Sequence, residues 1–182
     1  MHNRSDCHDQ SQPMLLPFKR KCQKTMETRF IVKPLEQNMN YLFDLSDAEL
    51  SRLGAARMIA DTFPGYPCRV SLVDAQIGEE MILLPFEHHA TTSPYRSSGP
   101  LFIRKGAVSA RLGENEIPEM LLHRLLSVRA YDQQGMMLAA HTLPGEQLAA
   151  EIQSLFALPD VAYLQVHNAG PGCYNCQIER VG

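Results

Sequence analysis

The end of the chain constrains the fold more than any other stretch, because two alternating runs flank a turn rich in glycine. VAYLQVH and CYNCQIERV lie on either side of NAGPG. Alternation of apolar and polar side chains with a period of two is typical of a strand with one buried face. Glycine and proline between two such runs favour a β-hairpin. The sequence therefore predicts that the chain closes with an antiparallel hairpin.

The apolar face of this hairpin sets its predicted register. We expect His167 to lie opposite Cys173 and Leu164 opposite Cys176, because this pairing places the apolar side chains of both strands on one face. A slip of one residue moves every side chain of a strand to the other face. It would place Leu164 against Gln177, which is a poorer match.

The motif CYNC at residues 173–176 has three interpretations: a metal-ligand pair, a redox pair, or two unlinked structural thiols. A zinc knuckle or a thioredoxin-like pair needs both sulfur atoms on one side of a turn or at a helix N-terminus. Residues three apart in a strand point to opposite faces, so we expect Cys176 in the core and Cys173 on the polar face. A second CxxC is missing. We therefore predict no metal site and no cofactor, while zinc binding through both cysteines and histidines stays an alternative.

Cys173 and His167 are the candidate catalytic residues. A cysteine beside a histidine can act as an activated thiolate nucleophile when a third group orients the imidazole. Asn168, Asn175 or Gln165 can supply that group. The alternative is structural: His167 caps the turn or bonds to backbone, and Cys173 is partly buried.

The loop SPYRSSGP at residues 93–100 is the candidate ligand-binding segment. Tyr95, Arg96 and Ser97 combine an aromatic ring, a guanidinium and a hydroxyl, which suit recognition of a carboxylate or a phosphate. We therefore expect a small anionic ligand here. The alternative is a packed turn in which Arg96 pairs with a surface carboxylate.

The other thiol and imidazole groups are predicted to be structural. Cys68 alternates with apolar residues and is expected in the core. His88 and His89 are adjacent in a predicted strand, so they point to opposite faces and cannot chelate one ion as neighbours. His123 and His141 are expected at core or edge positions.

The rest of the chain alternates between short strands and two or three helices. The segment 44–61 carries a capping box at Ser46 and Glu49, and 144–158 has apolar residues at helical spacing. We predict an α+β fold, a single domain with a mostly antiparallel sheet of about seven or eight strands and two or three helices on one face. Strands are expected at 28–35, 68–75, 80–89, 99–108, within 126–143 and in the final hairpin, and helices at 44–61, 116–126 and 144–158.

Charge divides the chain into two parts. Residues 1–25 have a net charge of +3, so the overall −3 leaves −6 for residues 26–182. We expect 1–25 to be a weakly ordered extension and 26–182 to form the domain. An acidic domain is a poor partner for nucleic acid.

The apolar runs and the cysteines bear on the compartment. No run approaches the length of a membrane span and the start is a poor signal peptide, so no membrane partner is expected. Five cysteines without a secretory signal favour reduced thiols and a cytoplasmic location.

Three ordered stretches carry a family resemblance: YPCRVSLVDAQIGEEMILLPFEHH, SPYRSSGPLFIR and VHNAGPGCYNCQIERV. Together they resemble the bacterial family catalogued as domain of unknown function 1203, over roughly residues 28–182. The resemblance implies a small bacterial cytoplasmic protein, and it implies no activity and no functional residue.

Two functions from different classes are compatible with these residues. One is a small-ligand-binding or enzymatic domain whose polar site lies near Arg96 and His167/Cys173. The other is a non-catalytic interaction or homodimerisation module. Proximity of Arg96, His167, Cys173 and His88/His89 within one concave pocket would favour the first, and their dispersal would favour the structural interpretation.

Overall fold

Antiparallel strands make up most of the fold. The computed structural model describes residues 28–182, so the predicted extension over 1–25 and the predicted domain start at 26 lie outside the described residues. Eight strands and three α-helices confirm the predicted α+β class. The strands are divided between two sheets, where the sequence suggested one. No helix within 28–182 combines the length and the apolar character that crossing a membrane requires.

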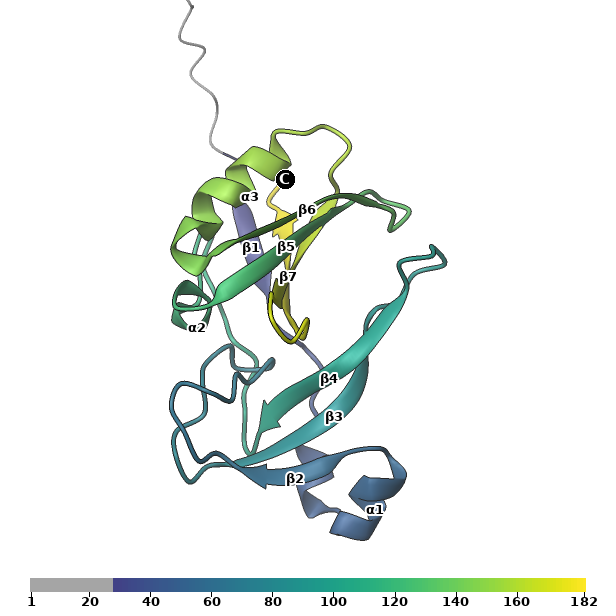
Figure 1. Ribbon diagram of the computed structural model, residues 1–182, viewed down its shortest axis with the longest axis vertical. Helices are drawn as coiled ribbons and strands as arrows, with labels where there is room; N and C mark the ends of the chain where they lie inside the picture. Colours follow the sequence, from purple (N-terminus) through teal and green to yellow (C-terminus); the bar gives the residue numbers. More distant parts are fainter. Residues whose placement is uncertain (1–27) are drawn as a thin grey trace, which may run out of the picture.

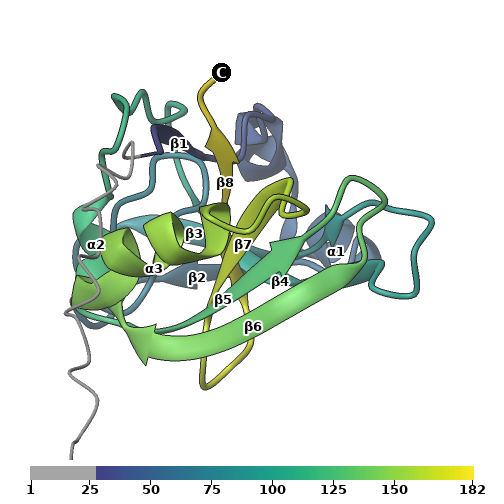
Figure 2. The ribbon, with the colours of Figure 1, turned by 90° about the horizontal axis from the view of Figure 1, so that it is seen from above.

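The larger sheet has five strands in the order β1-β8-β7-β5-β6, and Figure 1 shows it above the smaller one. Its strands are β1 (Phe30–Lys33), β5 (Leu125–Tyr131), β6 (Met137–Pro144), β7 (Tyr163–Asn168) and β8 (Tyr174–Arg180). Seen from above, β6 forms its outer edge (Figure 2). The helices of this half are α2 (Glu119–Leu122), the 3₁₀ helix η2 (Gly145–Gln147) and α3 (Leu148–Phe156).

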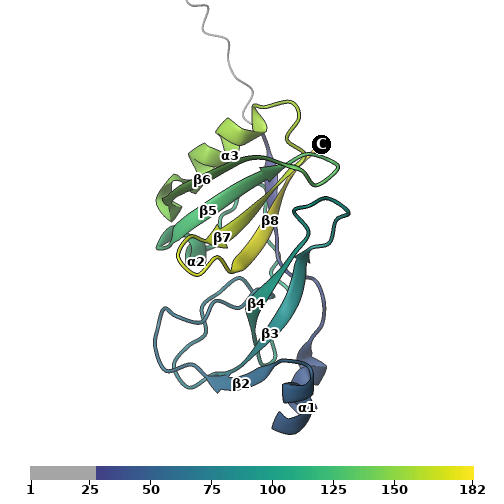
Figure 3. The same ribbon diagram turned by 45° about the vertical axis from the view of Figure 1, so that its right-hand side comes forward.

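The smaller sheet has three strands in the order β2-β3-β4. These are β2 (Ala56–Ile59), β3 (Glu80–His89) and β4 (Ser97–Arg104), accompanied by the 3₁₀ helix η1 (Asn40–Asp44) and by α1 (Asp47–Arg52). The β3–β4 hairpin reaches up to the β5–β6 turn (Figure 3). There the Thr91 hydroxyl donates to the Gln134 carbonyl at 3.1 Å, and the Ser93 hydroxyl donates to the Gly135 carbonyl at 2.7 Å.

Each sheet has its own hydrophobic core. In the larger half, α3 packs Leu148, Ile152 and Leu155 against inward residues of β5, β7 and β8, as their helical spacing predicts. In the smaller half, Leu50 of α1 packs with apolar residues of β3 and β4. Cys68 belongs to this second core and is fully buried, which confirms the prediction for that thiol.

The helix predicted over 44–61 is much shorter than expected. The capping box of Ser46 and Glu49 forms and starts α1 as predicted. Gly54 then adopts a left-handed φ of +69° and ends the helix, because glycine takes this conformation without steric cost. The following residues form β2, which pairs with β3 as an edge strand and was not predicted.

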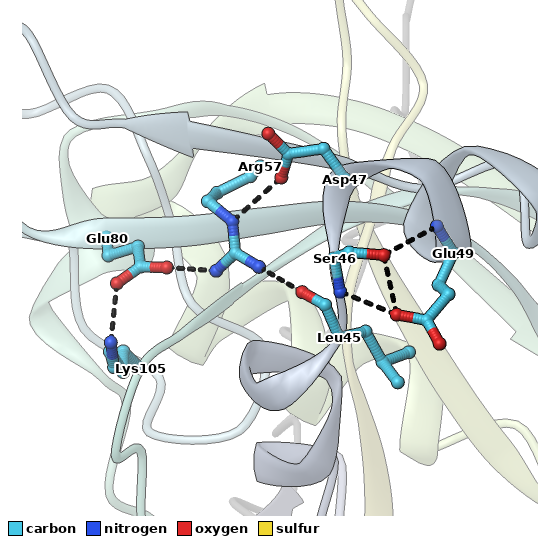
Figure 4. A network of polar contacts seen from close by, with 7 residues as sticks. All are labelled: Leu45, Ser46, Asp47, Glu49, Arg57, Glu80 and Lys105. Atoms are coloured by element: carbon cyan, nitrogen blue, oxygen red, sulfur yellow. Dashed lines mark hydrogen bonds and ion pairs between the residues drawn. The ribbon is translucent and has the colours of Figure 1, made fainter.

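Charged side chains tie α1 to the smaller sheet (Figure 4). Arg57 of β2 donates to Asp47 at 3.0 Å and to the Leu45 carbonyl at 2.6 Å, and it also pairs with Glu80 of β3. Lys105 reaches the other oxygen of Glu80 at 2.7 Å. Asp47 and Lys105 are exposed, whereas the side chains of Arg57 and Glu80 at the centre of the network are only 25% and 21% exposed, so the network orients α1 on the sheet.

The register predicted for the final hairpin is wrong by two residues along most of its length. Leu164 pairs with Ile178 instead of Cys176, and His167 lies opposite Tyr174 instead of Cys173. A β-bulge follows Val166, and the turn closes where the Asn168 amide donates to the Cys173 carbonyl at 2.9 Å. A shift of two residues preserves the alternation of faces. The predicted apolar face, with Cys176 in the core, is therefore confirmed.

Candidate functional site

A cluster of histidine and tyrosine rings fills the junction between the two sheets. The His88 ring stacks on Tyr174 with centroids 5.1 Å apart, and it meets the edge of His167, also at 5.1 Å. His89 donates from Nδ1 to the Tyr95 carbonyl at 2.7 Å, which leaves Nε2 to accept from the Tyr163 hydroxyl at 2.7 Å. The adjacent histidines therefore contact different partners, but both rings pack against the larger sheet, at a register shift of β3 between Glu87 and His89.

Burial removes basicity from this cluster. His167 is fully buried, and its Nδ1 donates to the Gly172 carbonyl at 3.0 Å. Burial lowers the pKa of His167 to about 3, and the nearby Arg129 guanidinium adds to this effect. Burial also lowers the pKa of His88. An imidazole with so low a pKa is a weak general base near neutral pH.

The structure places Cys173 outside hydrogen-bonding contact with His167. The Cys173 thiol is half-buried after the turn, and its polar contact is the Pro171 carbonyl at 4.0 Å. Cys176 lies in the core, where burial raises the pKa of its thiol to about 12. The two cysteines of CYNC thus occupy different environments. Within residues 28–182, no three His, Cys, Asp or Glu side chains are grouped as metal ligands.

The predicted ligand-binding residues lie at the tip of the β3–β4 hairpin. Arg96 is mostly exposed and pairs with Glu87, which is the surface pairing considered as its alternative role. Tyr95 is partly exposed, and Ser97 is half-buried opposite His89. Arg96 makes no hydrogen bond to His167 or Cys173, whereas Tyr95 contacts His89 and Tyr131, so the structure brings Tyr95 but not the Arg96 guanidinium into contact with the ring cluster.

A cleft of about 450 Å³ offers a different site on the described part of the chain. It lies between the loop after β2 and the helix α2. Its size is typical of small-molecule pockets. Apolar and polar side chains both line it: Phe63, Pro64, Val73, Asp74, Gln76, Glu119, Met120 and His123. Phe63 and Val73 are about half exposed, so the apolar wall is accessible to a ligand.

The loop that carries Asp74 is a rigid bridge between the two cores. Its ends are joined by the Ala75 amide donating to the Tyr66 carbonyl and by the Cys68 amide donating to the Val73 carbonyl, both at 2.9 Å. Leu72 has a left-handed φ of 52°, which is strained for a side chain of this type. These bonds close residues 68–75 into a loop, so the strand predicted there is wrong, and β3 pairs with β2 and β4 instead.

The loop is anchored to both halves of the protein. The Leu72 side chain lies in the core of the larger half, while Val70 lies in that of the smaller half. Arg69 is almost fully buried, and it donates from Nε to the Tyr174 carbonyl of β8 at 2.7 Å. Asp74 therefore has a position fixed by packing on both sides.

The opposite wall is equally constrained. The helix predicted within 116–126 forms as α2, with Pro118 at its N-cap and Met120 and Leu121 buried. Gly145 lies so close to α2 that a Cβ atom there would come within 1.9 Å of the Leu121 carbonyl oxygen. Its amide also donates to the Arg124 carbonyl at 2.8 Å. Both walls of the cleft are thus preformed.

The polar groups of the cleft centre on the carboxylate of Asp74. Arg124 donates to both of its oxygens, with Nη1 at 2.9 Å from Oδ2. Nε2 of His123 lies 3.4 Å from the same Oδ2. The Asp74 side chain is 3% exposed, whereas that of His123 is 40% exposed. A fixed acceptor and an accessible imidazole therefore lie side by side on the cleft wall.

A larger hollow of about 620 Å³ lies between the β5–β6 turn and residues 159–162. The polar groups that line it hold the local backbone. Asp132 accepts from the amides of Gln134 and Met136, both at 2.9 Å, and Arg180 donates to the carbonyls of Leu158 and Val161. We therefore favour the Asp74 cleft as the candidate site.

The sequence carried little signal for this cleft. His123 was expected at a core or edge position, and Asp74 stood out in no motif. The pairing of Asp74 with Arg124 joins residues 50 positions apart, so it depends on the fold. The prolines and the glycine of FPGYP mark the cleft wall only as a break in regular structure.

The family model described as "Protein of unknown function (DUF1203)" matches residues 65–180. This is more than half of the chain, and it includes most residues of the cleft. The chain belongs to this family, in agreement with the sequence resemblance. No curated protein and no solved structure matches the chain.

Proposed function

We propose that this member of the DUF1203 family binds a small molecule in the Asp74 cleft. The single observation that carries the proposal is a buried, doubly anchored carboxylate on the wall of an accessible, half-apolar cleft of about 450 Å³. An apolar part of the ligand would lie against Phe63 and Val73, and a polar part would face Asp74 and His123. A few fixed polar groups in an apolar cleft are the usual features of a specific small-molecule site.

The geometry supports binding more directly than catalysis. The His123 ring lies beside Asp74, but no cysteine thiol and no serine or threonine hydroxyl lines the described cleft as a nucleophile. The sequence-based site at Tyr95, Arg96, Ser97, His167 and Cys173 stays a prediction. The pairing of Arg96 with Glu87 and the lack of a hydrogen bond between Cys173 and His167 give it less support than the cleft, and the same holds for the anionic ligand that was inferred from Arg96.

A blocked cleft tests the proposal. Val73 is 46% exposed, so Val73→Trp should fill the cleft without disturbing a core. The matched control is Val108→Trp, because Val108 is 77% exposed and does not line the cleft. We expect a fragment library screened by ¹H–¹⁵N NMR to give hits that shift residues 63–76 and 119–124, and V73W alone to lose them. Hits that survive in V73W, or no hits at all, would contradict the proposal.

The edge strand β6 supports a second candidate, self-association. Its residues, MLAAHTLP, include no lysine, arginine, aspartate or glutamate, although charges commonly protect edge strands against pairing. Leu138 of this strand is 45% exposed. We propose homodimerisation through antiparallel β6–β6 pairing as the alternative function.

Sedimentation velocity distinguishes this alternative. We expect the wild-type chain to show a concentration-dependent dimer and Ala140→Lys, in the middle of β6, to be monomeric. The control Ala90→Lys changes an exposed alanine beyond the end of β3 and should leave the dimer intact. A wild-type protein that is monomeric at every concentration would exclude this candidate.

A further inference from the structure

The charges that line the Asp74 cleft are all negative or already neutralised within the cleft. Asp74 is paired with Arg124, and neither lysine nor arginine belongs to the lining. Glu119 makes no ion pair with any residue of 28–182, although it lies on the wall formed by α2. A ligand that enters the cleft therefore meets one uncompensated carboxylate and a second one whose lone pairs are only partly used.

The rim adds an aromatic surface. Phe63 is 52% exposed and lines the cleft, so its ring is available to a ligand. The face of an aromatic ring attracts a cation, and apolar groups also pack against it. A carboxylate and an exposed ring in one cleft are complementary to a positively charged group attached to a hydrocarbon body.

The net charge of residues 28–182 is also negative, like the carboxylates of the cleft. Residues 28–182 contain 12 lysine and arginine residues against 17 aspartate and glutamate residues, so 12 − 17 gives a net charge of −5. A negative field raises the local concentration of cations and repels anions. The cleft and the surrounding domain therefore select for the same ligand charge.

From these observations we propose that the ligand of the Asp74 cleft is an organic cation, an ammonium group on a small apolar or aromatic body. This inference rests on the proposed function and specifies its ligand class. The ammonium group lies by Glu119 and the acceptor oxygens of Asp74, and the apolar body lies against Phe63 and Val73. Arg124 holds the Asp74 side chain in position through both of its oxygens, and it does not contact the ligand.

Three probes of similar size and different charge test the ligand class on the full chain: phenethylammonium, phenethyl alcohol and hydrocinnamate. NMR titration should give about tenfold tighter binding for the cation than for the alcohol, because only the cation makes a charge-assisted contact with the carboxylates. Hydrocinnamate should bind most weakly. Glu119→Gln should remove most of the preference for the cation and leave the affinity for the alcohol unchanged.

One control variant and the pattern of probe affinities distinguish the outcomes. Glu146→Gln removes an exposed carboxylate that does not line the cleft, so it should leave all three affinities unchanged. Equal binding of the three probes, or tightest binding of hydrocinnamate, would overturn the cationic class and leave the proposed function standing. If no probe binds at millimolar concentration and the fragment screen also gives no hit, both proposals fail.

Discussion

Histidines lie in two contrasting environments in this protein. At the junction between the sheets, His88, His89 and His167 pack against tyrosine rings, and two of the three are nearly or fully buried. In the cleft, His123 is 40% exposed beside a fixed carboxylate. The junction is richer in reactive side chains, but its groups bond to one another. The cleft has fewer such groups, and they border open space.

A group of reactive side chains can bind a ligand only where it borders open space, and this distinguishes the cleft from the junction. At the junction, His89 and His167 have internal hydrogen-bond partners, the Tyr163 hydroxyl and the Gly172 carbonyl, whereas Nδ1 of His88 is buried without a partner within residues 28–182. Ring packing of this kind contributes to stability and specifies how the sheets meet. In the cleft, Asp74 is held by Arg124 and still borders a volume that a small molecule can occupy.

The largest expected effect concerns the wall of the cleft. Gly145→Ala should lower the free energy of unfolding by about 3 kcal/mol, since the added methyl group would come within 1.9 Å of the Leu121 carbonyl and force α2 to shift. Chemical denaturation measures this change. Gly170→Ala is the control, because nothing lies within 4 Å of a Cβ at that position. Equal stability of the two variants would show that the wall is not rigid.

Acid should weaken the junction by a somewhat smaller amount. The unfolded chain binds a proton at His167 near pH 6.5, whereas the folded protein, with a pKa of about 3, does not. Stability is therefore complete above about pH 7 and falls as the pH decreases. One such group removes about 1.4 kcal/mol per pH unit, or about 2 kcal/mol at about pH 5.

Chemical denaturation between about pH 7 and 5 measures how the free energy of unfolding changes with pH. This range lies above the one in which carboxylates titrate. The lowered pKa of His88 acts in the same direction. In His167→Gln the pH dependence of the free energy of unfolding should weaken by an amount that corresponds to about one proton. A slope that is identical in the variant and the wild type would mean that His167 is accessible and that the contrast between the regions is wrong.

Removing His123 from the cleft should affect ligand binding more than stability, unlike the changes described above. His123→Ala should lower stability by only about 0.5 kcal/mol, because the side chain is substantially exposed, and it should weaken fragment binding several-fold. His141→Ala is the matched control, since His141 is also exposed and contacts Glu151 outside the cleft. Unchanged fragment affinity in H123A would remove His123 from the binding site.

Thiol labelling compares the half-buried Cys173 with the buried Cys68 and Cys176. In a Cys7→Ser/Cys22→Ser background, iodoacetamide should label half-buried Cys173, while Cys68 and Cys176 should react on the order of a hundredfold more slowly. Peptide mass spectrometry measures each rate. Cys173 should react no faster than a free thiol, because His167 does not bond to it. A much faster reaction would restore the nucleophile prediction.

The parts of the fold that follow local patterns could be predicted from the sequence. The capping box of Ser46 and Glu49 starts a helix, apolar spacing defines α3, and alternation identifies β3, β4 and the final hairpin. The end of α1 required knowing that Gly54 adopts a left-handed conformation. The register depended on a β-bulge after Val166, which no side-chain pattern marks.

The candidate site was less predictable, because long-range contacts create it. The cleft brings Phe63, Asp74 and His123 together from a loop and a helix that are distant in the sequence. His167 and Cys173 drew attention because cysteine and histidine are reactive, although burial and the bulge separate their functional groups. Residue type indicates potential chemistry, whereas packing determines which groups meet and which remain accessible.

Histidine modification by diethyl pyrocarbonate, followed residue by residue with mass spectrometry, tests the contrast most directly. We predict rapid modification of His123 and of exposed His141, and slow modification of His89 and His167 until the protein unfolds. A fragment bound in the cleft should protect His123 alone. Modification of His167 as fast as that of His123, or failure of every bound fragment to protect His123, would contradict the contrast between the junction and the cleft.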